Sequence, residues 1–176
     1  MNFKEIYEHY GYPLPADGEV GIVALRSSAP ADSNAFDDFI GLVFHDGKSV
    51  LFRGTTDPGR NNYDKVARAE PGFYDRAYVI GMHRGKYTAF VNHGWTPVDF
   101  TRPGSGFPDT VGQSYIGINV HRAHATELRV EVNGYSAGCL VVQDSKDFAR
   151  MLLLAQTGQE FYDLALFDLD AALEPG

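Results

Sequence analysis

A chain of 176 residues with 44% hydrophobic and 22% charged side chains has the composition of a folded globular protein, which excludes an intrinsically disordered segment. Its formal net charge of -8 at pH 7 excludes the basic surface that neutralises nucleic-acid phosphates, so we expect no nucleic acid as a partner. The single cysteine cannot form a disulfide within the chain. We expect one domain over residues 1–176, with a core at about residues 20–156.

No segment predicts export or membrane insertion. The N-terminal residues lack the apolar core of roughly 7–15 residues that a secretory signal needs, and no stretch approaches the roughly 20 apolar residues that cross a bilayer. We therefore expect no membrane as a partner and a cytoplasmic location for the chain as synthesised.

Apolar residues at helical spacing occur in two segments. Residues 2–10 carry the first pattern, with Asn2 placed to cap the helix and Gly11 placed to end it. The second pattern begins after Asp144 or Ser145, either of which can serve as its N-cap. We expect a short amphipathic helix in each segment.

The other apolar segments alternate with period two or form short runs between turn residues, which is typical of β-strands. The expected strands are residues 20–24, 39–44, 50–52, 78–82, 86–91, 95–100, 115–121, 128–132, 140–142 and 161–167. Those between residues 78 and 100 are expected to form an antiparallel meander, and residues 161–167 an edge strand in preference to a helix. We expect a long loop or a broken strand over residues 53–73 and a loop over residues 101–110. The chain is therefore predicted to be mainly β.

The only cysteine of the chain follows a Ser136-Ala137-Gly138 turn. A lone cysteine in a buried strand is most often a small apolar core residue. Gly138, however, allows the backbone to approach a substrate, and a turn entering Cys139 can direct two N–H groups to one point, as an oxyanion requires. Cys139 is therefore a candidate nucleophile, with a core residue as the alternative.

A histidine upstream of the cysteine is the candidate general base. His121 ends an expected strand in which Asn119 and His121 share one face. Such a polar pair is most simply exposed to solvent, but a histidine beside a free cysteine can take up the thiol proton. His121, His124 and Cys139 could alternatively bind zinc, which we disfavour because residues three apart on a strand point to opposite faces. We expect no metal and no cofactor.

Two further histidines, His83 and His93, fall in the turns between expected strands. We expect both side chains to be solvated and assign neither to the site.

The segment from His121 to Leu140 resembles the signature of a known enzyme family. Fourteen residues separate His121 from Ser136-Ala137-Gly138-Cys139-Leu140. This pattern resembles the L,D-transpeptidase catalytic domain, in which a histidine is followed at a similar spacing by Ser/Thr-His-Gly-Cys and a hydrophobic residue. Residues 55–59 and 70–74 look like the turns that line the substrate groove of that family. The sequences GINVHR and YSAGC also look like those of uncharacterised phage and bacterial proteins. The resemblance covers roughly residues 40–156.

Three positions depart from the family pattern. Ala137 stands where the family has a histidine, Val141 where it usually has an arginine, and Arg122 where it usually has a glycine. We expect slower turnover or a different substrate from the first change. Arg122 or Arg53 is expected to replace the missing cation.

The resemblance implies an antiparallel β-sandwich with a few short helices and a cysteine mechanism. His121 would take the proton from Cys139, whose thiolate is expected to form readily beside an imidazole. The N–H groups of Gly138 and Cys139 would hold the oxyanion, Ser136 would position the loop, and a thioester would form. The residues expected to bind substrate are Arg122, Arg53, Tyr135 and Asn119.

The implied partner is a peptidoglycan stem peptide, in which an L,D-peptide bond would be cleaved or exchanged. The activity would be that of an L,D-carboxypeptidase, an endopeptidase or an L,D-transpeptidase, released to the cell wall by phage lysis or a secretion system. Ala137 motivates the alternative, a non-catalytic phage or bacterial binding or structural module that retains the fold. We expect fast alkylation of Cys139 near pH 6 to distinguish the enzyme from the module. The sequence leaves the oligomeric state open.

Overall fold

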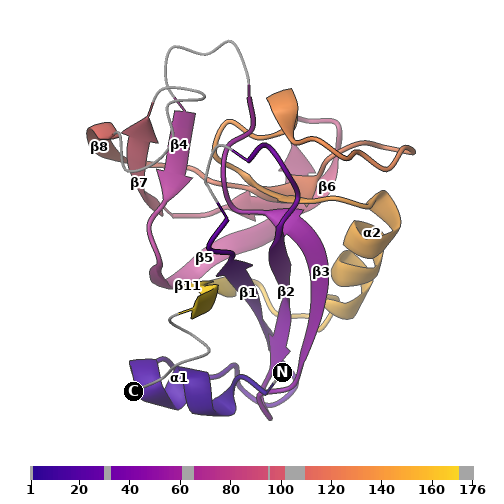
Figure 1. Ribbon diagram of the computed structural model, residues 1–176. Helices are drawn as coiled ribbons and strands as arrows, with labels where there is room; N and C mark the ends of the chain where they lie inside the picture. Colours follow the sequence, from indigo (N-terminus) through magenta and orange to yellow (C-terminus); the bar gives the residue numbers. More distant parts are fainter. Residues whose placement is uncertain (1, 30–32, 61–65, 95, 102–109, 171–176) are drawn as a thin grey trace.

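The computed structural model describes residues 2–29, 33–60, 66–94, 96–101 and 110–170 (Figure 1). Residues 102–109, and with them most of the expected loop at 101–110, lie outside these ranges. The elements are α1 (Lys4–Tyr10), β1 (Val20–Arg26), β2 (Asp38–Phe44), β3 (Ser49–Thr55), β4 (Val66–Ala69), β5 (Gly72–His83), β6 (Tyr87–Asn92), β7 (Thr96–Thr101), β8 (Thr110–Ile116), β9 (Val120–Arg122), the 3-10 helix η1 (Asn133–Tyr135), β10 (Leu140–Val142), α2 (Ser145–Leu154) and β11 (Tyr162–Asp168).

Eight strands close into a barrel in the order β1-β11-β5-β6-β9-β10-β3-β2. The pairs β1–β11 and β9–β10 are parallel, and the other neighbouring strands are antiparallel. The prediction of a mainly β chain is thus confirmed. The antiparallel β-sandwich is not, because one mixed sheet closes on itself instead of forming two stacked antiparallel sheets.

Strand β11 closes this barrel, so the core does not end near residue 156. Strand β11 lies between β1 and β5, so the prediction that residues 161–167 form an edge strand is wrong. The physical reason is burial on both faces of the strand. Leu164 and Leu166 belong to the main apolar cluster inside the barrel, whereas Ala165 and Phe167 belong to a second cluster that includes α1.

Both predicted helices are present, and the predicted N-cap Asp144 is correct; the N-cap of α1 is Phe3 and not Asn2, which lies one residue before it. Asn2 Oδ1 accepts a hydrogen bond from the Lys4 N–H at 3.0 Å, and Gly11 ends α1 in the left-handed conformation at φ 67°. The Asp144 carboxylate accepts from the Lys146 N–H at 2.8 Å at the start of α2. Neither helix in the described ranges has the length and apolar character needed to cross a bilayer.

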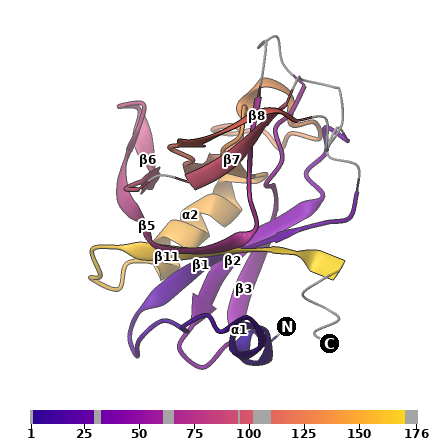
Figure 2. The ribbon, with the colours of Figure 1, turned by 90° about the vertical axis from the view of Figure 1, so that its left-hand side faces the viewer.

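Strands β4, β7 and β8 form a separate three-stranded sheet. This sheet lies at the end of the molecule opposite α1 in both views (Figure 1 and Figure 2). The meander expected over residues 78–100 is correct only for β5 and β6, because β7 pairs with β4 and β8. The single strand expected over residues 115–121 is also wrong, since the chain leaves β8 after Ile116 and enters the barrel as β9 at Val120.

The alternating segment at residues 128–132 is not a strand. Its pairing is limited to one isolated bridge between Ala35 and Glu131. Leu128 and Val130 are 63% and 78% exposed, so of the apolar residues in the pattern only Val132 packs against other residues. The chain instead passes through η1 and enters the turn before Cys139.

Candidate active site around Cys139 and His121

The parallel pair β9–β10 brings the two candidate catalytic residues together. Leu140 is in register with Val120, and Val141 with His121. The Leu140 N–H donates to the Asn119 carbonyl at 3.0 Å, and the Asn119 N–H donates to the Cys139 thiol. Cys139 therefore immediately precedes β10, and His121 on β9 is in register with Val141, two residues after the cysteine.

The hydroxyl of Ser136 closes the turn before the cysteine. Ser136 is fully buried, and its Oγ accepts from the Gly138 N–H at 3.1 Å and donates to the Cys139 carbonyl at 2.8 Å. Ser136 therefore positions this turn. The Gly138 N–H, which we expected to hold an oxyanion, is already bonded to Ser136 Oγ.

Strand β4 holds the outer side of the same turn. The Ala67 N–H donates to the Ala137 carbonyl at 3.0 Å. Gly138 has a φ of 138°, and a Cβ at this position would lie 2.8 Å from both Ala67 Cβ and the Ala67 carbonyl oxygen. Only glycine fits this close backbone approach. Ala137 is exposed, so the position of the family's second histidine lies at the surface.

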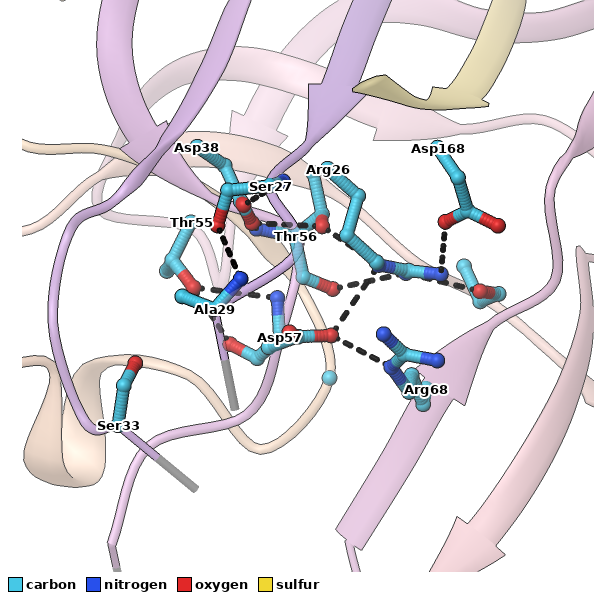
Figure 3. A network of polar contacts seen from close by, with 12 residues as sticks. Arg26, Ser27, Ala29, Ser33, Asp38, Thr55, Thr56, Asp57, Arg68 and Asp168 are labelled. Atoms are coloured by element: carbon cyan, nitrogen blue, oxygen red, sulfur yellow. Dashed lines mark hydrogen bonds and ion pairs between the residues drawn. The ribbon is translucent and has the colours of Figure 1, made fainter. Parts of the chain in front are cut away.

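A buried ionic network fixes β4 and the residues 55–59 turn against the barrel (Figure 3). Arg26 is 1% exposed; its Nε lies 3.2 Å from Asp57 Oδ1, and its guanidinium donates to the Ala69 carbonyl at 2.9 Å. Arg68 on β4 lies 2.7 Å from the same Asp57 oxygen. Asp38 accepts from the Thr56 N–H at 2.6 Å. Such a network is costly to break, because any remaining charge would be buried without its partner.

This network reaches the cysteine turn through Gly59. The Gly59 N–H donates to the Ser136 carbonyl at 3.0 Å, and a Cβ on Gly59 would lie 2.2 Å from the Asn133 carbonyl oxygen. The sequence resemblance implied that the turn at residues 55–59 lines a substrate groove. In the structure this turn is hydrogen-bonded to the cysteine turn and supports it.

The imidazole of His121 is buried and has a defined tautomer. It is 6% exposed, and its Nδ1 lies 2.9 Å from the Arg122 carbonyl oxygen. Because a carbonyl only accepts, Nδ1 carries the proton and Nε2 has a free lone pair when the ring is neutral. Burial is the main effect that lowers the pKa of His121 to about 4. The hydrogen bond to the Arg122 carbonyl raises this pKa, and the charges of His83 and Arg84 lower it further. His121 is thus a neutral base near pH 7.

Two side chains that we did not assign to the site contact His121. His83 is 6% exposed, not solvated as predicted, and its ring stacks on that of His121 at a centroid distance of 4.4 Å. The Tyr87 hydroxyl lies 3.3 Å from His121 Nδ1. His93, by contrast, is exposed as predicted. Sequence reasoning missed His83 because the turn signal at residues 83–85 does not reveal that His83 ends β5 and stacks on His121 of β9.

The surroundings of Cys139 disfavour the reactive thiolate that we expected. Burial raises its pKa, and the N–H of Asn119 and the charge of Arg84 only partly oppose that effect. No hydrogen bond joins Cys139 Sγ to His121, both of which belong to the described residues. The free protein therefore holds the thiol and the imidazole in their neutral forms.

We expect iodoacetamide to alkylate Cys139 severalfold more slowly than N-acetylcysteine at pH 7, because the thiolate is the reacting form and its population is reduced. Mass spectrometry of the intact protein over time measures the rate. Labelling faster than the reference thiol near pH 6 would contradict the electrostatics described here. Slow labelling no longer separates an enzyme from a binding module, since burial alone produces it.

The structure places the expected substrate-binding arginines differently. The Arg122 guanidinium lies 4.3 Å from the centre of the Tyr87 ring, beside the imidazole. Arg53 is not brought to the site, because its guanidinium donates to the Phe36 carbonyl at 3.0 Å on the far side of β10 from β9. The exposed Arg84 was missed by sequence reasoning, although its charge acts on both His121 and Cys139.

An open groove of ≈ 700 Å³ adjoins the cysteine turn. It is lined by Arg129, Val130, Glu131, Asn133, Gly134 and Tyr135. Tyr135 also packs in the same apolar cluster as Cys139. Tyr135 therefore lines the groove and packs against the apolar cluster that Cys139 also contacts.

Among the residues that the structure describes, no three His, Cys, Asp or Glu side chains cluster as metal ligands would. His121 Nδ1 is bonded to a main-chain carbonyl and His124 Nδ1 accepts from the Glu127 N–H at 3.1 Å. The zinc alternative thus gains no support from these contacts.

Comparison with known proteins adds no relative to this picture. The chain matches no protein-family model, no curated protein and no solved structure. The functional argument therefore depends on the arrangement of Cys139, His121 and their neighbours.

Proposed function

We propose that the protein is a cysteine-dependent enzyme that cleaves or exchanges an L,D-peptide bond in peptidoglycan stem peptides. The observation that supports this proposal is the parallel pairing of β9 with β10, in which the oriented imidazole of His121 is in register with Val141, two residues after the only cysteine and its glycine turn. The Nε2 lone pair of His121 is the feature that a general base requires.

The neutral pair favours a proton transfer that accompanies attack. The Cys139 sulfur forms a bond to the substrate carbonyl carbon while its proton passes to His121 Nε2, and the carbonyl electrons move onto oxygen. The protonated imidazole then gives its proton to the leaving amine, which leaves a thioester on Cys139. Water or a second amine resolves this thioester with His121 again acting as the base.

The oxyanion would be held near the cysteine turn. Because the Gly138 N–H donates to Ser136, the Cys139 N–H is the remaining donor of the two that the resemblance implies. Ser136 and Gly138 act through the shape of the turn in this mechanism.

The groove beside Tyr135 suits a peptide that carries both charges. Arg129, which is ion-paired with Glu127 at 2.7 Å, and Glu131 line it on the same segment, so a carboxylate of one stem peptide would share Arg129 with Glu127 and its ammonium group would face Glu131. Arg84 and Arg122 add positive charge on the imidazole side, where a terminal carboxylate would lie.

The second candidate is a binding or structural module without catalysis. It is favoured by two observations, the raised pKa of Cys139 and the exposed Ala137 in place of an imidazole. In this alternative the groove binds a wall peptide and leaves it intact.

Purified peptidoglycan incubated with the wild type or with Cys139→Ala distinguishes the two candidates. Mass spectrometry of the stem peptides should reveal loss of D-alanine or new cross-links with the wild type only. The His121→Gln variant should lower the rate by about 10²–10⁴-fold, since it removes the base. If the wild type leaves every muropeptide unchanged across several wall chemistries, the enzyme proposal is wrong; co-sedimentation with unaltered wall would then support the module.

A further inference from the structure

Two side chains, those of Asn119 and His83, connect the main chain of Asn92 on β6 to the imidazole of His121, and the direction of each hydrogen bond can be assigned. The Asn92 N–H donates to Asn119 Oδ1 at 2.8 Å. A main-chain N–H can only donate, so this bond identifies the oxygen of the Asn119 amide and leaves Nδ2 as a donor on the other side.

The next contact fixes the tautomer of His83. Asn119 Nδ2 lies 3.1 Å from His83 Nδ1. Since Nδ2 donates, His83 Nδ1 must accept, and the proton of the neutral ring is on Nε2. The ring of His83 then stacks on His121 with an interplanar angle of 27°.

Asn92 is itself held firmly, so the chain has a fixed origin. Its side-chain amide donates to the Ala77 carbonyl at 3.2 Å and lies 3.4 Å from Thr96 Oγ1, and Thr96 is buried. Asn119 in turn contacts Cys139 through its main chain. One residue thus touches the thiol with its backbone and the histidine pair with its side chain.

We propose that Asn92, Asn119 and His83 are positioning residues that hold the His121 ring in the plane in which Nε2 is free for the thiol proton, while the Arg122 carbonyl fixes its tautomer. This inference rests on the proposed function for its catalytic consequence. It also assigns a role to His83, which stacks on His121. Position 137, where the family that the sequence resembles has a second histidine, is alanine in this chain.

The geometry is tested by ¹⁵N NMR of the histidine rings at pH 7. The wild type should show His83 protonated on Nε2 and His121 protonated on Nδ1. Asn119→Asp replaces the donor with an acceptor and should move a proton onto His83 Nδ1. The inference is overturned if wild-type His83 carries its proton on Nδ1, or if Asn119→Asp leaves the His83 signals unchanged.

The catalytic consequence is tested without peptidoglycan, by acylation of Cys139 with p-nitrophenyl acetate. In this reaction the sulfur bonds to the acetyl carbon, p-nitrophenolate leaves and the thiol proton goes to His121. His83→Phe keeps a stacked ring but removes the acceptor, and should lower the acylation rate about tenfold through misplacement of His121. The acid limb of its pH profile should move to higher pH, because His83 no longer opposes protonation of His121.

The matched control is His93→Phe, the same substitution at an exposed histidine. It should acylate at the wild-type rate. A His83→Phe protein with the wild-type rate and pH profile overturns the positioning role. If wild-type Cys139 does not acylate at all, the nucleophile of the proposed function fails, and the NMR pattern alone decides whether the three residues orient His121.

Discussion

Gly138→Ala should lower the free energy of unfolding by about 2–5 kcal/mol, the sum of strain at a positive φ and of overpacking against a neighbouring strand. The added methyl group would meet Ala67 at 2.8 Å, at both its Cβ and its carbonyl oxygen. Because the carbonyl belongs to the backbone of β4, the clash cannot be relieved by a side-chain rotation. Urea denaturation followed by circular dichroism measures the loss.

A second glycine near the same turn provides the control. Gly134→Ala places a methyl group where nothing lies within 4 Å, and should change the unfolding free energy little. Combining Gly138→Ala with Ala67→Gly removes one of the two clashes and should recover part of the loss. Equal stability of Gly138→Ala and Gly134→Ala would mean that the turn does not have this conformation in solution.

Acidification should destabilise the protein through His121. Its pKa is about 4 in the folded protein against 6.5 for an ordinary histidine, so the unfolded chain binds the proton more readily. The stabilisation from the neutral buried ring is complete above pH 6.5 and is lost as the pH falls towards 4. Between pH 7 and pH 5 the loss should be about 2 kcal/mol from this residue.

Urea titrations at the two pH values test this linkage. His121→Gln should lose about 2 kcal/mol less than the wild type between pH 7 and pH 5. His83 retains a contribution of the same sign in that variant, because burial and the charge of Arg84 also lower its pKa. His9→Gln, an exposed substitution on α1, should behave as the wild type does. A wild-type pH dependence in His121→Gln would rule out the buried neutral imidazole.

Local signals were sufficient for much of this molecule. Gly11 and Asp144 correctly predicted the end of α1 and the start of α2, and the glycine turn before Cys139 is present as expected. These features depend on neighbours in sequence, where hydrogen-bonding and backbone preferences act directly.

Features set by distant contacts were not predictable. The alternation at residues 128–132 has the pattern of a strand, but a strand also needs a partner, and the chain provides only one bridge at Glu131. His83 stands between an expected strand and a turn, and no neighbouring residue in the sequence indicates that its ring stacks on His121 in the folded barrel. The lowered pKa of His121 has the same origin, because burial is a property of the folded barrel.

The parallel pairing of β1 with β11 has a consequence for the order of folding. These strands come from opposite ends of the chain, so the barrel cannot close until nearly all of it has been synthesised. Contacts between such distant segments are slow to form. Until β11 arrives, the edges of β1 and β5 are unpaired, and an unpaired edge is where another chain can add a strand. Pairing of β11 with both β1 and β5 therefore removes the two edges at which the unfinished barrel could aggregate.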